Sequence, residues 1–206
     1  MSFLYSFDNF SDYYNKTFGK SEEHIKYFGI NSGTPDKVAE NVKVLFYNKI
    51  SEDFAVTLKT KEGDEIILYR TNDEKSFEEY YEDIENKEKE YTNSKIFGKS
   101  DKLLVPYVNV NGRITYEGLV GKYIKNTRGM YIETASQDVH FYLNENGCNL
   151  ESSSTLVTAT YSDTDRYFEF DNTFIIFMKE KDAKLPYFAL KVDNTDILEK
   201  KEVNDI

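Results

Sequence analysis

Residues of the kinds that carry catalysis are sparse in this chain. A metal centre needs about three converging His, Cys or carboxylate ligands, yet the two histidines, His24 and His140, lie far apart in the sequence. His140 alternates with Val139 and Phe141, a pattern typical of a structural histidine on a strand. There is no Gly-rich loop before a helix and no Gly-x-Ser-x-Gly motif, and the 37 acidic residues are too scattered to single out an acid–base pair. The sequence therefore predicts no enzyme activity, no metal site and no cofactor.

The segment with the clearest functional signal is the polar stretch 148–167. It contains no Pro or Gly, and Ser and Thr are spread along it together with Leu156, Val157 and Ala159. A connection of about twenty residues without secondary structure is uncommon in a compact domain and is usually functional or mobile. We therefore interpret 148–167 as a loop that another protein binds.

Two strands are predicted after this loop. Residues 168–178 and 185–192 are rich in aromatic and β-branched side chains, which fit a pleated, buried surface. The charged residues 179–184 form a short turn between them, so we expect a hairpin with both faces covered, inside a core.

These segments resemble, in order, those of the serpin family. Residues 141–147 (Phe-Tyr-Leu-Asn-Glu-Asn-Gly) are similar to the serpin strand that ends in an Asn-Glu-x-Gly hinge. Residues 170–174 (Phe-Asp-Asn-Thr-Phe) resemble the Phe-x-x-Pro-Phe opening of the next-to-last strand, and residues 187–194 (Tyr-Phe-Ala-Leu-Lys-Val-Asp-Asn) the closing Phe-x-Gly-x-Val-x-Asn strand.

The resemblance extends upstream. Residues 104–110 followed by 116–121 (Tyr-Glu-Gly-Leu-Val-Gly) are similar to the family's Leu-Pro-x-Phe strand and the helix after it. Residues 1–18 can be aligned with the serpin strand that carries the Val-Asn-Ala-x-Phe-Phe-x-Gly-x-Trp pattern. Coverage is then about residues 3–195.

The fold that the resemblance implies is α+β and β-rich: a partial serpin of mostly antiparallel sheets or a barrel, with few helices, forming one domain over residues 1–206. A whole serpin is nearly twice as long, so the chain resembles one truncated at its N-terminus. The missing half would carry most of the helices and leave a three-strand remnant of the large sheet. Such a remnant would expose a sheet edge at residues 3–9 and an uncovered sheet face.

The activity that the resemblance implies is inhibition of a serine-type protease. The protease attacks the exposed reactive loop, the cleaved loop inserts into the large sheet, and the acyl-enzyme is distorted by strain stored in the uncleaved fold. The family's loop length, counted from Glu145, places the attacked bond at Tyr161–Ser162. A tyrosine there would suit a chymotrypsin-like apolar pocket, although Tyr161 is also one of 17 tyrosines in the chain and both interpretations stay open.

The family's hinge falls on Glu145, Asn146 and Gly147 and continues into the loop. Alternate residues of an inserting strand point inward and must be small to enter a closed sheet. The inward set is Cys148, Leu150, Ser152 and Ser154, and the outward set is Asn149, Glu151 and Ser153. Leu150 is the large exception, and overpacking of this kind costs roughly 1 to 3 kcal/mol. Cys148 is better interpreted as a small hinge residue than as a reactive thiol.

Four positions depart from the family. Gln137 and Ser6 stand where serpins usually have the His and Asn that hold the opening region of the large sheet, Leu190 replaces a Gly and Thr173 a Pro. Two functions therefore remain open: a serpin-type inhibitor, intact or degenerate, and a non-inhibitory binding module that uses the loop or the exposed edge. The expected partners are a chymotrypsin-like protease or another protein, with a second copy or a complementing chain at the exposed edge.

Composition limits the other classes of partner. The formal charge of −11 gives no basic footprint, so neither nucleic acid nor an anionic membrane is expected. No apolar run approaches 18 residues, the N-terminus lacks a signal-peptide pattern, and the single cysteine excludes an internal disulfide. These features favour a cytoplasmic location.

The scaffold around the loop is predicted to be mainly sheet. Residues 54–60 and 65–69 form a meander hairpin around Gly63. A helix begins at Ser76, which forms a capping box with Glu79. Its buried stripe comprises Phe77, Tyr80, Tyr81, Ile84 and Tyr91. The Glu and Lys residues of 78–90 form a solvated face.

Overall fold

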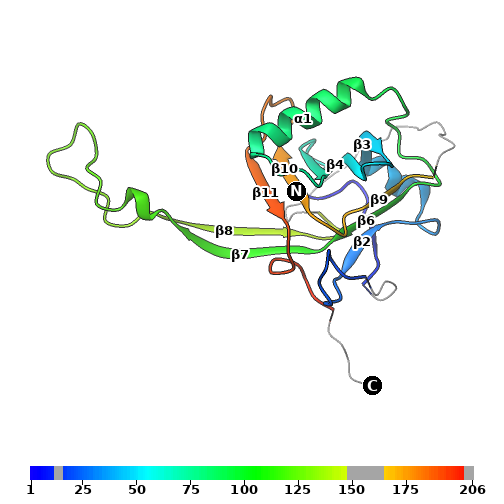
Figure 1. The fold of residues 1–206 in the computed structure, drawn as a ribbon, viewed down its shortest axis with the longest axis horizontal. Helices are drawn as coiled ribbons and strands as arrows, with labels where there is room; N and C mark the ends of the chain where they lie inside the picture. The colour runs from blue at the N-terminus through cyan, green and yellow to red at the C-terminus, as the bar shows by residue number, and fades with distance from the viewer. Residues whose placement is uncertain (12–15, 148–164, 202–206) are drawn as a thin grey trace, which may run out of the picture.

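The computed structural model describes residues 1–11, 16–147 and 165–201 (Figure 1). Its strands are β1 (Asp8–Asn9), β2 (Tyr27–Ile30), β3 (Val42–Asn48), β4 (Asp53–Lys59), β5 (Glu65–Arg70), β6 (Lys102–Pro106), β7 (Val108–Thr115), β8 (Ser136–Leu143), β9 (Tyr167–Glu169), β10 (Phe174–Lys179) and β11 (Phe188–Val192). The helices are α1 (Phe77–Glu90) and the short 3-10 helices η1 (Asp36–Asn41) and η2 (Glu117–Leu119). The predicted α+β class, rich in strands and poor in helices, is confirmed.

Five antiparallel strands form the larger sheet, in the order β11-β10-β5-β4-β3. Phe54, Val56 and Leu58 point into the main core, whereas Ala55 between them belongs to a second core under α1, which lies across that face (Figure 1). Side chains alternate between the faces of a strand, so a strand buried on both faces is apolar along its whole length. This explains the continuous apolar runs of β5 and β10.

Both predicted hairpins are confirmed. β4 pairs with β5 around a turn in which Gly63 has φ +90°. β10 pairs with β11 from Phe174 opposite Val192 to Met178 opposite Phe188. β10 is buried up to Met178, but β11 is half-buried except for Val192. The expectation that both strands of this hairpin are covered is therefore wrong for β11, because it is the outer strand of the sheet and pairs within it only with β10.

The predicted helix and its capping box are confirmed in α1. Ser76 Oγ accepts a hydrogen bond from Glu79 N at 3.3 Å, and Glu79 Oε2 accepts one from Ser76 N at 2.8 Å. Tyr80, Tyr81 and Ile84 are buried against the larger sheet. Phe77 lies in the first turn and is 45% exposed; its ring meets that of Phe177 edge to face, with the centroids 6.3 Å apart.

The prediction of an open edge at residues 3–9 is wrong, because the phenylalanines of this segment enter the core. Phe3 and Phe7 are 2% and 3% exposed, and their rings lie 6.4 and 5.6 Å from that of Phe28. Burying a phenylalanine is worth about 1.5–3 kcal/mol, which favours this path over an extended exposed strand. Only the two residues of β1 pair at the edge of the smaller sheet, whose order is β1-β2-β6-β9 with β6 and β9 parallel.

β7 and β8 form a two-stranded ribbon that projects away from the body (Figure 1). The sequence predicts a three-strand remnant of the large sheet, whereas β7 and β8 form a sheet of two strands among the described residues. The base of the ribbon is fixed where Phe141 stacks on Phe188 at 4.9 Å and where Asn109 N donates to Ile197 O at 2.8 Å. The helix predicted at 116–121 is only the single turn η2, because Gly118 and Gly121 disfavour a longer one. No helix among the described residues is long and apolar enough to cross a membrane.

Candidate functional site

The sequence places the functional segment between β8 and β9, and the structure describes its two ends. Glu145, Asn146 and Gly147 of the predicted hinge are described. The other predicted site residues, Cys148, Asn149, Leu150, Glu151, Ser152, Ser153, Ser154, Tyr161 and Ser162, lie outside the described residues. We call residues 144–147 the upstream anchor and residues 165–167 the downstream anchor.

The upstream anchor is held by the first residues of the chain. Asn146 O accepts a hydrogen bond from Phe3 N at 3.1 Å, and Glu145 O accepts one from Phe7 N at 2.9 Å. A tight turn adds a third hydrogen bond, in which Gly147 N donates to Asn144 O at 3.2 Å. Since Phe3 and Phe7 are buried, the backbone at the predicted hinge is tied to the core on one side.

Glycine is the residue type that fits position 147. Its φ is +114°, and a Cβ there would lie 2.7 Å from Met1 O and 2.9 Å from the Cα of Ser2. Contacts this short with backbone are relieved only by moving the neighbouring strand. The Asn-Glu-x-Gly pattern thus has a physical cause here, which is the close passage of residues 1–3.

A hydrogen bond to a buried tyrosine orients the Glu145 side chain. Tyr107 Oη donates to Glu145 Oε2 at 2.5 Å. Burial and the neighbouring carboxylate both raise the pKa of Tyr107 well above its usual value, so the phenol keeps its proton and remains a donor.

The residues that depart from the serpin pattern have separate environments. Ser6 Oγ donates to Asn146 Oδ1 at 2.8 Å, at the upstream anchor. Gln137 lies out on the ribbon, where it accepts a hydrogen bond from Tyr116 Oη at 2.7 Å. Leu190 packs partly buried beside the main core, and Thr173 N is bonded to Asn172 Oδ1 at the entry to β10. The hydrogen bonds described for Ser6 and Gln137 therefore serve different parts of the fold.

The downstream anchor is a buried ion pair between Arg166 and Asp101. Their side chains are 5% and 1% exposed, and Arg166 Nη2 lies 2.6 Å from Asp101 Oδ2. The remaining guanidinium hydrogens reach Ser94 O and Ile96 O, both at 2.6 Å, and Tyr91 Oη at 3.2 Å. Burial alone would lower the pKa of Arg166, but the hydrogen bonds and charge of Asp101 raise it, so the guanidinium stays charged.

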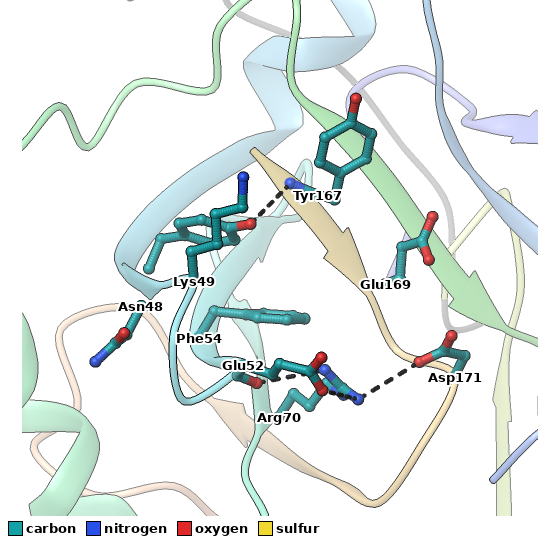
Figure 2. Close-up of a pocket in the computed structure, with 9 residues that line it drawn as sticks. Asn48, Lys49, Glu52, Phe54, Arg70, Tyr167, Glu169 and Asp171 are labelled. Atoms are coloured by element: carbon teal, nitrogen blue, oxygen red, sulfur yellow. Dashed lines mark hydrogen bonds and ion pairs between the residues drawn. The ribbon is translucent and has the colours of Figure 1, made fainter. Parts of the chain in front are cut away.

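Two cavities border the downstream anchor and share Tyr47 and Lys49 as lining residues. One of about 280 Å³ contains Arg70, whose Nη2 lies 3.1 Å from Glu52 and 3.7 Å from Asp171 (Figure 2). Arg70 Nε is buried and has no hydrogen-bond partner among the described residues. The other cavity, about 570 Å³, is lined also by residues 91, 93, 94, 165 and 166.

Within the described residues no group of three or more His, Cys, Asp and Glu could hold a metal ion. His140 is exposed on the polar face of the ribbon opposite Asn111, and His24 lies elsewhere, in a bridge to Thr17. The sequence interpretation missed Tyr107, Asp101, Arg166 and Arg70, because each acts through partners distant in the chain; Asp101 and Arg166, for example, are 65 positions apart.

Comparison with known proteins identifies the fold. No protein-family model matches the sequence, and no curated protein matches it. Solved structures do: a serpin from the trematode Schistosoma haematobium has a TM-score of 0.60 at 14% identity, covering 94% of this chain and 54% of that one. Mouse protein-Z dependent protease inhibitor has a TM-score of 0.61 at 12% identity, with 93% and 52% covered. Human thyroxine-binding globulin complexed with thyroxine has a TM-score of 0.60 at 9% identity, with 94% and 53% covered.

The chain therefore has a partial serpin fold. It spans about half the length of the solved structures that it matches. The fold class and the serpin resemblance expected from the sequence are confirmed, at identities that show the fold alone.

We expect Gly147→Ala to lower the free energy of unfolding by more than about 2 kcal/mol, because the new methyl would combine an unfavourable φ with a backbone clash. Gly112→Ala is the matched control, since a Cβ there meets nothing within 4 Å. Urea denaturation followed by circular dichroism measures both. Equal effects of the two substitutions would contradict the packing described for Gly147.

Arg166→Met should cost about 3–5 kcal/mol, because it leaves Asp101 buried without its counter-charge. Asp101→Leu added to Arg166→Met should recover part of this loss. Arg113→Met is the control, because Arg113 and its partner Asp138 are 66% and 54% exposed and such pairs are worth at most about 1 kcal/mol. Strictly additive single and double variants in urea denaturation would show that the pair is uncoupled.

Proposed function

We propose that this protein presents residues 148–164 to a serine-type protease as an extended, substrate-like segment and inhibits it, with Tyr161–Ser162 as the attacked bond. The observation that carries this function is the pair of anchors on a partial serpin fold. One anchor is tied by backbone hydrogen bonds to the buried N-terminal segment and the other by the Arg166–Asp101 pair.

Fixed ends favour binding for a thermodynamic reason. A segment tied at both ends has fewer conformations to lose when a protease groove orders it, so less of the interaction energy is spent on ordering. Well-packed supports also hold a binding segment closer to its productive geometry than a free terminus can.

The same geometry limits the insertion of the loop after cleavage. A loop inserts with most gain into a sheet that closes on it from both sides, and the described large-sheet remnant is the ribbon β7–β8 alone. We infer that insertion beside β8 is slow, and that the size of Leu150 slows it further. The protein then behaves mainly as a slowly processed substrate that competes for the protease.

Chymotrypsin is the protease to test. We expect one dominant cut at Tyr161–Ser162 by mass spectrometry and slowed turnover of a reporter peptide. Tyr161→Asp should remove both effects, whereas Tyr187→Asp, which changes a tyrosine 54% exposed on the body, should leave them intact. Cleavage at scattered tyrosines, or no slowing of the reporter, would reject inhibition.

Leu150→Ala should raise the fraction of protease held in a complex that survives denaturation, because a smaller inward side chain removes a packing cost of roughly 1 to 3 kcal/mol. Ser153→Ala, at a predicted outward position, is the control and should change nothing. Complexes are quantified on denaturing gels at a fixed ratio of the two proteins. A response to Ser153→Ala in place of Leu150→Ala would mean that the hinge register is shifted by one residue.

A non-inhibitory binding module is the second candidate. The cavities beside the downstream anchor favour it, because Arg70 there has an unused buried donor. Thyroxine-binding globulin, one of the structurally similar proteins, is described in complex with thyroxine. A chain that is ignored by chymotrypsin and yet binds a small polar ligand with loss of affinity in Arg70→Met would support this candidate.

A further inference from the structure

The densest group of exposed apolar side chains lies at the far end of the β7–β8 ribbon (Figure 1). Seven of the fourteen large hydrophobic side chains that are exposed among the described residues fall between positions 116 and 131. This tip patch consists of Tyr116, Leu119, Val120, Tyr123, Ile124, Met130 and Tyr131. Single exposed apolar residues are ordinary, but a contiguous group marks an interaction site.

The tip has a defined backbone conformation. Gly121 N donates to Ile132 O at 2.8 Å, and Ile124 N donates to Met130 O at 2.9 Å. The rings of Tyr123 and Tyr131 meet edge to face at 6.4 Å. The patch is thus preformed, which reduces the ordering cost of a contact.

The ribbon that carries the tip lacks a covering layer. Val108 pairs with Leu143, Val110 with Phe141 and Gly112 with Val139 on one apolar face, whose base packs on the main core through Val108, Val110, Phe141 and Leu143. Val139, farther out opposite Gly112, is half-exposed. An isolated two-stranded ribbon is marginally stable in water and gains from packing its apolar face on another layer.

Charge distinguishes the ribbon from the body. Residues 108–143 contain four basic and three acidic residues, a net charge of +1, which leaves −12 for the rest of the chain. Two bodies of this charge repel each other at contact. An eight-residue strand spans about 26 Å, about three Debye lengths at physiological ionic strength, so bodies that are held apart by their ribbons repel only weakly.

We propose that two copies of this chain associate through the ends of their ribbons, tip patch against tip patch, about a twofold axis. Both signs of charge favour a contact of a surface with itself, and the tip carries exposed Lys122, Lys125 and Arg128 beside Glu117 and Glu133. The same two glutamates disfavour an anionic membrane as the occupant. Each tip then covers the exposed apolar side chains of the other.

Light scattering over a concentration series tests the association. The mass should rise from the 24.1 kDa of one chain toward twice that value. The double variant Tyr123→Ser and Met130→Ser, at positions 77% and 58% exposed, should weaken dimerisation at least about tenfold and leave the circular dichroism spectrum unchanged. The control, Ile50→Ser and Leu185→Ser, changes body positions 98% and 71% exposed and should dimerise like the unaltered chain.

A monomer at every concentration, or equal weakening in the control, would overturn the proposal. Added salt should leave the dimer intact or strengthen it, because it screens the two bodies. A dimer that dissociates in salt would instead place a basic tip on an acidic body, which also overturns it.

Cross-linking tests the twofold geometry directly. In a Cys148→Ser background, Tyr123→Cys should form a disulfide-linked dimer on mild oxidation, and Ile50→Cys should not. The reverse pattern would exclude contact between tips. A chain that remains monomeric and sediments with phosphatidylserine vesicles through its tip would assign the patch to membranes instead.

Discussion

The buried ion pair between Arg166 and Asp101 determines where the chain enters the fold after residue 164. It joins the start of β9 to the 94–101 segment, and its hydrogen bonds extend to Tyr91 at the end of α1. Separating these charges inside the protein would cost several kcal/mol, so Arg166 has one favourable position. Phe168 and Phe170 follow it into the core, and β10 then takes an interior place in the larger sheet. The geometry of everything downstream depends on this contact.

Features with a local cause could be predicted from the sequence. The capping box of α1 involves residues three apart, and the hairpins β4–β5 and β10–β11 each consist of two apolar runs and a turn. The resemblance of short motifs in the right order indicated the serpin fold, although identities to solved serpins of 12–14% are too low for the whole sequence to reveal it.

Features that depend on distant partners could not be predicted. Nothing near Arg166 in the sequence indicates Asp101, and the path of residues 1–9 is set by burial of Phe3 and Phe7 against β2 rather than by their strand-like pattern. The hinge was predicted at Glu145, Asn146 and Gly147 from the family motif alone, and the close passage of residues 1–3 that requires a glycine at 147 could not be predicted. The ribbon was missed because its alternating pattern is the same whether a strand lies inside a sheet or projects from it.

The interior position of β10 has a consequence for a nicked chain. β10 is bonded to β5 on one side and β11 on the other, and Phe174, Ile175 and Ile176 are fully buried. A break between residues 148 and 164 would divide the polypeptide but leave the two pieces associated, because two strand pairs cross the break: β10 with β5 and β9 with β6. The molecular mass measured under native conditions would not change after this cleavage, and the two pieces would separate only when the sheet unfolds.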